Sequence, residues 1–234
     1  MSPIDSALDT YIEVGSKRVF AGAIEWPGWC RRGTSAGSAL EALVDAAPRY
    51  AAVVKGVRPA FRAPKGVDDL RIVERVQGNA TTDFGAPSIT PELDRRPVDA
   101  EELARLRNVL EASWAAFDAA AEGASGMQLS TGPRGGGRTL AKIVSHVVEA
   151  EAAYTRKILG RPPSGAEGPG ASAMAREVRA VVLAALERAV TDGLPEAGPR
   201  GGKLWTPRYF VRRAAWHVLD HAWEIEDRSY PEPT

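Results

Sequence analysis

The pattern of apolar and polar residues changes near residue 98. Before that point, short aromatic and β-branched runs alternate with turn-forming residues, and after it apolar residues recur every three or four positions. The pattern predicts a mixed α+β chain, with a small α+β unit over residues 1–80 and an all-α four-helix bundle over residues 98–230. Residues 81–97, rich in proline, are predicted to form an irregular linker.

The N-terminal part combines strand signals with one strong turn signal. Pro27 and Gly28 stand between two tryptophans and force a turn, since proline fixes φ and glycine admits positive φ. Ser35 can cap a helix that runs through Leu40 and Leu43. Aromatic, β-branched and alternating residues predict strands near Tyr11–Glu13, over Arg18–Trp26 and over Leu70–Val76.

Four apolar stripes at helical spacing follow. The first begins at Asp99, with Glu102 three residues later, which predicts a capping box. The last begins with Thr206 as N-cap and Pro207 at the first helical position. Each stripe predicts a helix that buries one face, over Leu103–Phe117, Leu140–Ile158, Met174–Ala189 and Phe210–Arg228.

Composition narrows the choice of partners. Thirty basic and thirty acidic residues give no net charge, so no nucleic acid is expected as a partner. Cys30 is the one cysteine, which excludes an intrachain disulfide and permits a reducing compartment. No run of about 18 apolar residues is present to span a membrane. We expect a cytoplasmic protein without membrane contact.

The chain has three histidines, His146, His217 and His221, and all fall on predicted inward helix faces. His217 and His221 are four residues apart, which puts both on one side of a helix. Three imidazoles directed at one cavity can bind a divalent metal ion and leave a coordination position open for chemistry. The pattern predicts such a site; the alternative is three unrelated histidines, each satisfied in the core or at the surface.

Two runs resemble a known family. Arg212–Glu224 and Ile143–Glu151 are similar to the last and second helices of the DinB/YfiT-like superfamily. The resemblance implies a four-helix bundle, often dimeric, that holds zinc or nickel on His146, His217 and His221. It also implies an activity such as that of the thiol-dependent S-transferases and isomerases of the superfamily. A homodimer and a small-molecule substrate, with a low-molecular-weight thiol as the example, are therefore the expected partners.

The N-terminal unit carries a second resemblance. Phe20–Ala23, then the Trp26–Trp29 turn, Gly33 and a helix from Ser35 are similar to the HicB-like antitoxin fold. In that fold a strand leads to a Pro-Gly turn, then a glycine, then a helix. The resemblance implies a HicB-like α/β unit that packs over the bundle.

Further polar residues are candidates for chemistry. Glu149 and Glu224 each follow a histidine by three residues and are candidate catalytic bases or partners of the histidines. Glu151 and Asp220 are expected to form surface ion pairs. Arg212 and Arg213, near Arg208 at the start of the last helix, are candidates to bind an anionic cofactor or a substrate carboxylate.

These features favour a metal-dependent enzyme, with thiol-dependent transfer or isomerisation implied by the resemblance. A metal-dependent hydrolase is the alternative reaction, because a metal on three imidazoles also activates water. A non-catalytic, metal-stabilised binding module with an antitoxin-like domain is the alternative class.

Overall fold

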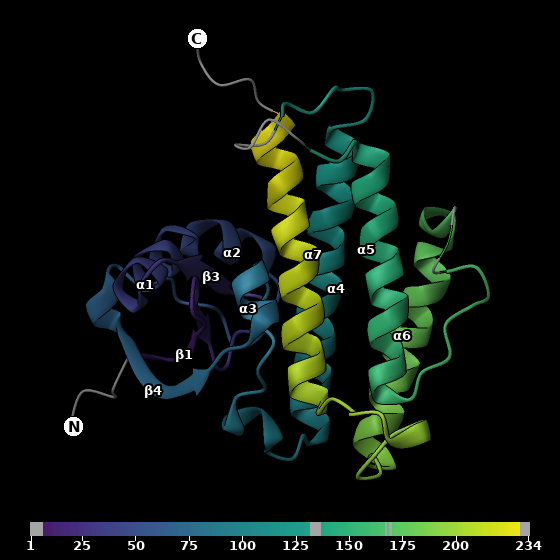
Figure 1. Cartoon of the computed structure of the whole chain (residues 1–234), viewed down its shortest axis with the longest axis horizontal. Helices are drawn as coiled ribbons and strands as arrows, with labels where there is room; N and C mark the ends of the chain where they lie inside the picture. The colour runs from purple at the N-terminus through teal and green to yellow at the C-terminus, as the bar shows by residue number, and fades with distance from the viewer. Residues whose placement is uncertain (1–6, 132–136, 167, 169, 230–234) are drawn as a thin grey trace.

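The computed structural model describes residues 7–131, 137–166, 168 and 170–229. A small sheet with short helices lies beside a set of long helices (Figure 1), so the predicted α+β class is confirmed. Residues 1–6 and 230, at the outer limits of the two predicted units, lie outside the described residues. In the part of the chain that is described, no helix combines the length and hydropathy needed to span a membrane.

A four-stranded sheet forms in the N-terminal part, in the order β3-β2-β1-β4. Its strands are β1 (Leu8–Val14), β2 (Val19–Ala23), β3 (Cys30–Gly33) and β4 (Leu70–Gln77). β1 pairs antiparallel with β2 and parallel with β4. The sequence pattern predicts β1, β2 and β4 but misses β3, because that strand contains no aromatic or β-branched residue.

Helices cover both faces of the sheet. All five residues of β2 are buried, which requires packing on each side. The helix α1 (Ala36–Asp45) packs against β2 and β3, and α2 (Ala47–Val53) follows it. On the other side, Phe20 of β2 meets Trp216 of the last helix edge to face, with ring centroids 6.1 Å apart.

Side-chain caps account for the starts of two of the short N-terminal helices. Ser35 caps α1 as predicted, in a reciprocal capping box with Ser38. The segment predicted to be an irregular linker contains the helix α3 (Ala80–Phe84) and a 3₁₀ turn from Glu92 to Arg95. The prediction was wrong there because the Asn79 side chain accepts hydrogen bonds from backbone N–H groups of the first turn and starts a helix.

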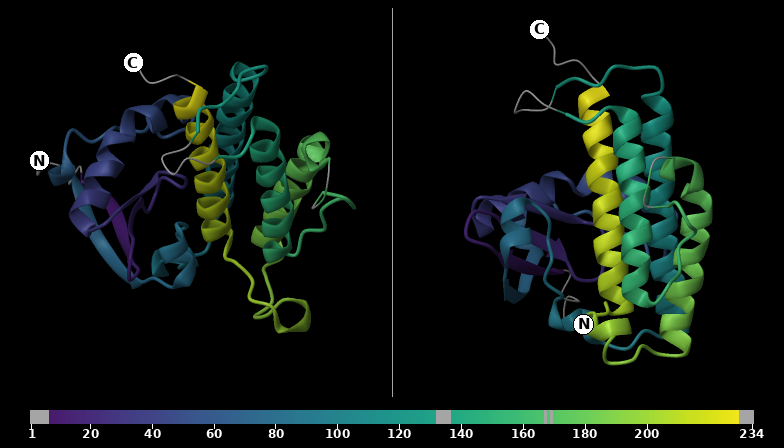
Figure 2. Two further views of the ribbon diagram at one scale, coloured as in Figure 1. Left: turned by 45° about the horizontal axis from the view of Figure 1, so that its top comes forward. Right: turned by 45° about the vertical axis from the view of Figure 1, so that its right-hand side comes forward.

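The four predicted long helices are present and pack together (Figures 1 and 2). The Asp99 and Thr206 side chains cap the first and last of them as predicted. The capping box predicted at Asp99 is only half formed, because the Glu102 side chain pairs with Arg105 and Arg208 and does not bond back to Asp99. The second long helix ends at Thr155, three residues earlier than predicted, and is followed by a 3₁₀ turn over Arg156–Ile158 and then a left-handed Leu159. Their bounds are α4 (Ala100–Gly123), α5 (Leu140–Thr155), α6 (Ala175–Thr191) and α7 (Pro207–Ser229).

Helix α7 lies between the N-terminal unit and the other long helices (Figure 1) and is buried around almost its whole circumference. The predicted Pro-Gly turn packs directly against it. Gly28 has φ of 92°, and a Cβ there would lie 3.0 Å from Ala215 Cβ and 3.1 Å from a Leu219 methyl group. Glycine is therefore required both by the backbone conformation and by the close approach of the turn to α7.

A buried ion pair joins α7 to the N-terminal part. Arg212 donates from Nε and Nη2 to the two carboxylate oxygens of Asp94, at 2.6 and 2.7 Å. It also donates to the carbonyls of Ala23 and Ile24. Both charged side chains are fully enclosed, with at most 4% of either exposed. These partners occupy all three guanidinium nitrogens of Arg212, so the residue has a structural role. This corrects the prediction that Arg212 binds an anionic cofactor or a substrate carboxylate.

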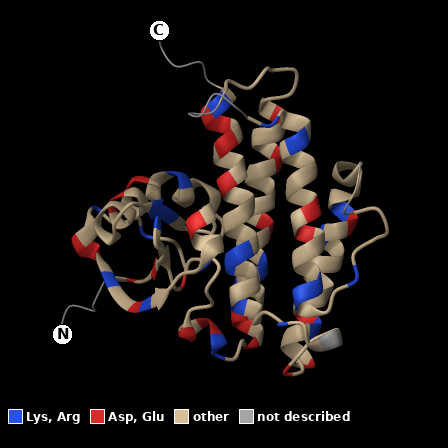
Figure 3. Cartoon of the chain, viewed as in Figure 1, with Lys and Arg blue, Asp and Glu red and all other residues tan. Residues whose placement is uncertain are grey.

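The charges of α7 are segregated along the helix. Figure 3 shows basic residues towards its N-terminal end and acidic residues in its C-terminal half, with the basic Arg228 in the last turn. Arg208 in the first turn opposes the helix macrodipole, whereas Arg228 in the last turn complements it. Several charged residues of α7 have partners in other elements. Arg208 pairs with Glu102 of α4, Asp220 with Arg31 of β3, and Glu226 with Arg49 of α2.

We expect Arg212→Met to lower the free energy of unfolding by about 3–5 kcal/mol, since it leaves the Asp94 carboxylate buried without its counter-charge. Urea denaturation followed by circular dichroism measures the change. Adding Asp94→Leu to the variant should recover part of the loss. The control is Arg96→Met, which breaks a half-exposed pair with Glu25 and should cost no more than about 1 kcal/mol. Equal losses in the two single variants would contradict the structural role of Arg212.

Candidate metal centre

The three histidines come together between two helices. His146 is on α5, and His217 and His221 are one turn apart on α7. Their ring centroids are 4.7 to 5.1 Å apart, and one ring nitrogen of each lies within 4.8 Å of the others. His217 and His221 are buried and His146 is partly exposed, so the cluster reaches the surface on the α5 side.

The geometry of the rings fits a metal ion. The Nε2 atoms of His146 and His217 are 3.2 Å apart. Two nitrogens bound to one tetrahedral ion at about 2.0–2.1 Å would be separated by about 3.4 Å. The Nδ1 atom of His217 is buried and has no hydrogen-bond partner among the described residues. An ion held at Nε2 would not contact Nδ1, so within the described residues this nitrogen has no partner with or without a metal, at a cost of about 1–3 kcal/mol.

The surroundings keep two of the rings neutral. Burial, with the positive charge of Arg138 and a contribution from His221, lowers the pKa of His146 to about 4. Burial, followed by the effect of His221, holds the pKa of His217 well below its ordinary value. Both imidazoles therefore have a free lone pair at neutral pH, which is the form that binds a metal.

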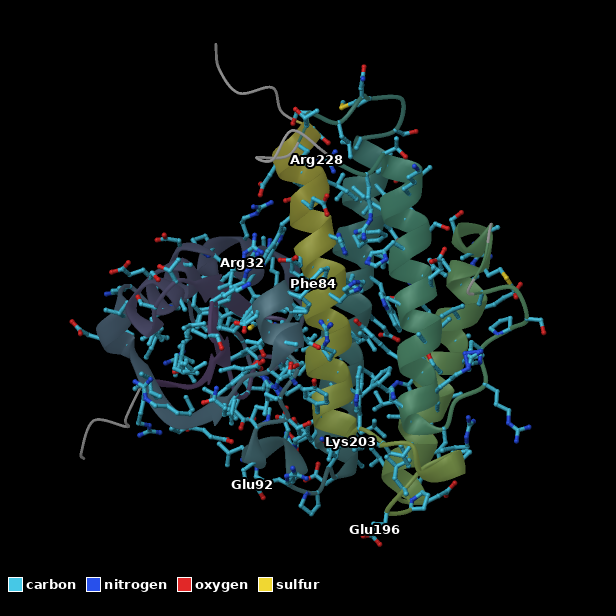
Figure 4. The ribbon with its side chains drawn as sticks, viewed as in Figure 1. Arg32, Phe84, Glu92, Glu196, Lys203 and Arg228 are labelled. Carbon is cyan, nitrogen blue, oxygen red and sulfur yellow. The ribbon has the colours of Figure 1, made fainter. Side chains whose placement is uncertain are left out.

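A carboxylate orients the third ring. Glu224 lies 2.7 Å from Nδ1 of His221 and accepts a 2.8 Å hydrogen bond from Arg228 at its other oxygen. Arg228, at the end of α7 (Figure 4), is itself held by the carbonyls of Ser130 and Arg138. With the proton on Nδ1, Nε2 of His221 presents its lone pair to the cluster, as in histidines that bind metals through a carboxylate partner.

The second predicted carboxylate is placed differently. Glu149 is partly buried on α5 and accepts a 3.3 Å hydrogen bond from Ser145 of the same helix. It forms no hydrogen bond or ion pair with the three histidines in the described part of the chain. Of the two predicted carboxylates, the structure therefore brings Glu224 into contact with a histidine and leaves Glu149 one turn beyond His146.

Aromatic residues line the cluster on the side of His217. The Tyr154 ring lies 5.7 Å from the His217 ring, and Trp205 lies 5.0 Å from Tyr154. Neither residue was predicted to be part of a site. Tyr154 follows His146 by two helical turns, so helical spacing could have placed it on the same face. Trp205 precedes α7, and its position depends on the connection from α6.

A cleft of about 670 Å³ lies beside the cluster, between α7 and the N-terminal unit. Arg31 stacks on Trp223 at 3.9 Å, and Arg32 (Figure 4) lies on the same wall. Glu224 and Arg228 line it as well, so the carboxylate that orients His221 borders the cleft.

The comparisons with known proteins assign the helical part to a family. The sequence model of the DinB superfamily matches residues 109–225, half of the 234 residues, and the chain therefore belongs to the DinB superfamily. The match runs from α4 to α7 and includes all three histidines. No curated protein and no solved structure matches the chain. The comparisons give no support to the HicB-like assignment of the N-terminal unit.

A second buried carboxylate lies deeper among the long helices. Glu151 was expected at the surface, but its side chain is only 2% exposed. It accepts a hydrogen bond from the Trp114 indole, and Arg179, which also binds Asp118, lies 3.7 Å away. Burial raises the pKa of Glu151 from 4.5 to about 7 against the opposing effect of Arg179. Arg179 comes from α6, and this contact could not be inferred from α5 alone.

Glu151 should make stability depend on pH. With a folded-state pKa of about 7, the stability from its protonated form is fully present below about pH 4.5 and is lost as pH rises through 7. We expect the free energy of unfolding of the wild type, relative to Glu151→Gln, to fall by about 3 kcal/mol across this range. Urea denaturation at a series of pH values measures the difference. The control is Glu187→Gln, at an exposed site on α6, whose free energy of unfolding should change with pH as that of the wild type does. Parallel plots of the free energy of unfolding against pH for wild type and Glu151→Gln would contradict the raised pKa of Glu151.

Proposed function

We propose that this member of the DinB superfamily is a metal-dependent enzyme in which His146, His217 and His221 hold one divalent cation, with zinc or nickel the expected ions. The observation that carries the proposal is the convergence of three imidazoles from two helices, with nitrogens within 4.8 Å of one another. Three ligands leave a coordination position for a reactant. The partial exposure of His146 supports access to it.

The residues of the chain have distinct roles in this proposal. When bound, the cation would supply Lewis acidity that lowers the pKa of a coordinated thiol or water. Glu224 holds the His221 ring in the tautomer that presents Nε2. Tyr154 and Trp205 exclude water from the side of His217. Glu149 is the candidate base, since its carboxylate is not committed to the histidines.

The proposed reaction is thiol-dependent transfer or isomerisation, with a low-molecular-weight thiol as one reactant. In the transfer form, the thiol sulfur bonds to an electrophilic carbon while that carbon releases its leaving group, and the thiol proton passes to a base such as Glu149. Family membership supports this choice only by analogy. The neutral imidazoles of His146 and His217, and the Glu149 carboxylate that is not bound to them, are compatible with it.

The N-terminal unit is proposed to be HicB-like in fold and to act as a cover for α7. The order of strand, Pro-Gly turn, Gly33 and capped helix supports the likeness. The Gly28 turn on Ala215 and the Arg212–Asp94 pair support the covering role.

The metal proposal is tested by metal analysis. Wild-type protein, incubated with excess zinc or nickel and then desalted, should retain about one ion per chain. His146→Ala, His217→Ala and His221→Ala should each lose most of it, because two imidazoles bind far more weakly than three. The control is Asp220→Asn, which changes a residue of α7 between the two histidines and leaves every ligand in place.

A second arm uses Glu224→Gln, which keeps all three histidines and removes the charge that orients His221. We expect its metal affinity to fall by about 10- to 100-fold, as for comparable partners of metal-bound histidines. A variant with all three histidines changed to alanine gives the background. If wild-type protein retains no more metal than this variant, the metal proposal is wrong.

Activity is tested with the metal-loaded protein and paired substrate panels. Thiols with alkylating or unsaturated electrophiles test transfer and isomerisation, and esters and amides test the hydrolase alternative. We expect turnover with the thiol panel that is lost in His217→Ala and kept in Asp220→Asn. Full metal loading without turnover on either panel would favour a metal-stabilised binding module.

A further inference from the structure

Arg213 is a buried cation that has no hydrogen-bond or ion-pair partner among the described residues. Its residue is 9% exposed, and its Nη1 atom is buried and makes no hydrogen bond. Within the described residues, no carboxylate, carbonyl or hydroxyl accepts from any of its nitrogens. The adjacent Arg212, by contrast, has four acceptors. Of these two adjacent arginines, Arg212 therefore has all its guanidinium nitrogens hydrogen-bonded, whereas Arg213 has none bonded within the described residues.

The position of Arg213 relates it to the histidine cluster. It precedes His217 by one helical turn, so both side chains leave α7 on the same side. Its guanidinium carbon lies 5.3 Å from the Tyr154 ring centre, and that ring lies 5.7 Å from the His217 ring. Tyr154 thus contacts the guanidinium and the histidine together. The Trp216 ring, 4.7 Å away, forms a second aromatic wall.

The contacts within the protein do not fully stabilise the buried charge of Arg213. Burying a guanidinium without an ion-pair partner is costly, and contact with two aromatic faces offsets only part of that cost. The buried Glu13 carboxylate forms no ion pair with Arg213. Its oxygens accept instead from Thr82 and from backbone N–H groups of Ser88 and Ile89. The remaining donor capacity of Arg213 is available to an anion from outside the chain.

We propose that Arg213 binds the carboxylate of a small-molecule reactant, which lies along Tyr154 with its other end at the histidine cluster. A planar guanidinium matches a carboxylate in shape and charge. One unpaired positive charge is neutralised by one negative charge, and the aromatic walls suit an apolar or aromatic body. The assignment of the reacting end rests on the proposed metal function, whereas the anion subsite depends on Arg213 alone.

The test measures ligand binding by isothermal titration calorimetry, with benzoate as the probe and benzamide as its neutral isostere. Metal-free protein is titrated first, so that benzoate cannot bind through a metal, and zinc-loaded protein second. The variants are Arg213→Gln and Arg213→Met, the latter filling the site with an apolar side chain. The control is Arg208→Gln, which removes the same charge from α7 at a residue already paired with Glu102.

We expect metal-free wild type to bind benzoate at least about tenfold more tightly than either Arg213 variant, as for a hydrogen bond to a charged group. Benzamide should bind no more tightly to wild type than to the variants, and Arg208→Gln should match wild type. Equal benzoate affinity in wild type and both Arg213 variants would overturn the proposal, as would tighter binding of phenyl phosphate than of benzoate.

Metal analysis of the same preparations separates the two proposals. Arg213→Gln should retain as much zinc as wild type, since it removes no ligand. If the wild-type protein does not retain zinc, the proposed metal function is overturned. The titration of metal-free protein then decides alone whether the anion subsite exists.

Discussion

The structure depends on the burial of α7 on every side. A helix enclosed in this way must match three surfaces at once: the Pro-Gly turn of the sheet layer, α4, and α5. Apolar side chains fill most of these contacts, and the Arg212–Asp94 pair fixes the helix along its axis. Because His217 and His221 are part of the same helix, the core that places α7 also places two of the three candidate ligands.

The candidate site reflects a balance between burial and hydrogen bonding. Burial favours neutral imidazoles, and neutral imidazoles need partners or a metal to satisfy their nitrogens. The chain of Arg228, Glu224 and His221 satisfies one ring from outside the cluster. Among the described residues, the His217 ring has no such partner on its Nδ1. The His221 end of the site is thus held by Glu224 and Arg228. The His217 end, next to Tyr154 and Arg213, has a ring nitrogen without a hydrogen-bond partner among the described residues.

Local signals were predictable from the sequence, and distant contacts were not. The caps at Ser35, Asp99 and Thr206 depend on neighbouring residues, so they could be inferred directly. The pairing of His217 with His221 follows from helical spacing, and the approach of His146 was predicted from its inward position on its own helix and supported by the family resemblance. The strand β3, the burial of Glu151 and the different roles of Arg212 and Arg213 could not be inferred. Each depends on residues from elements far away in the chain.

The place of α7 in the chain has a consequence for synthesis. Its contact partners in the sheet layer and in α4 leave the ribosome before it and keep an apolar surface uncovered until α7 emerges. Two of the three histidines are on α7. The same helix therefore completes both the core and the three-histidine cluster, and a chain that stops short of α7 has neither.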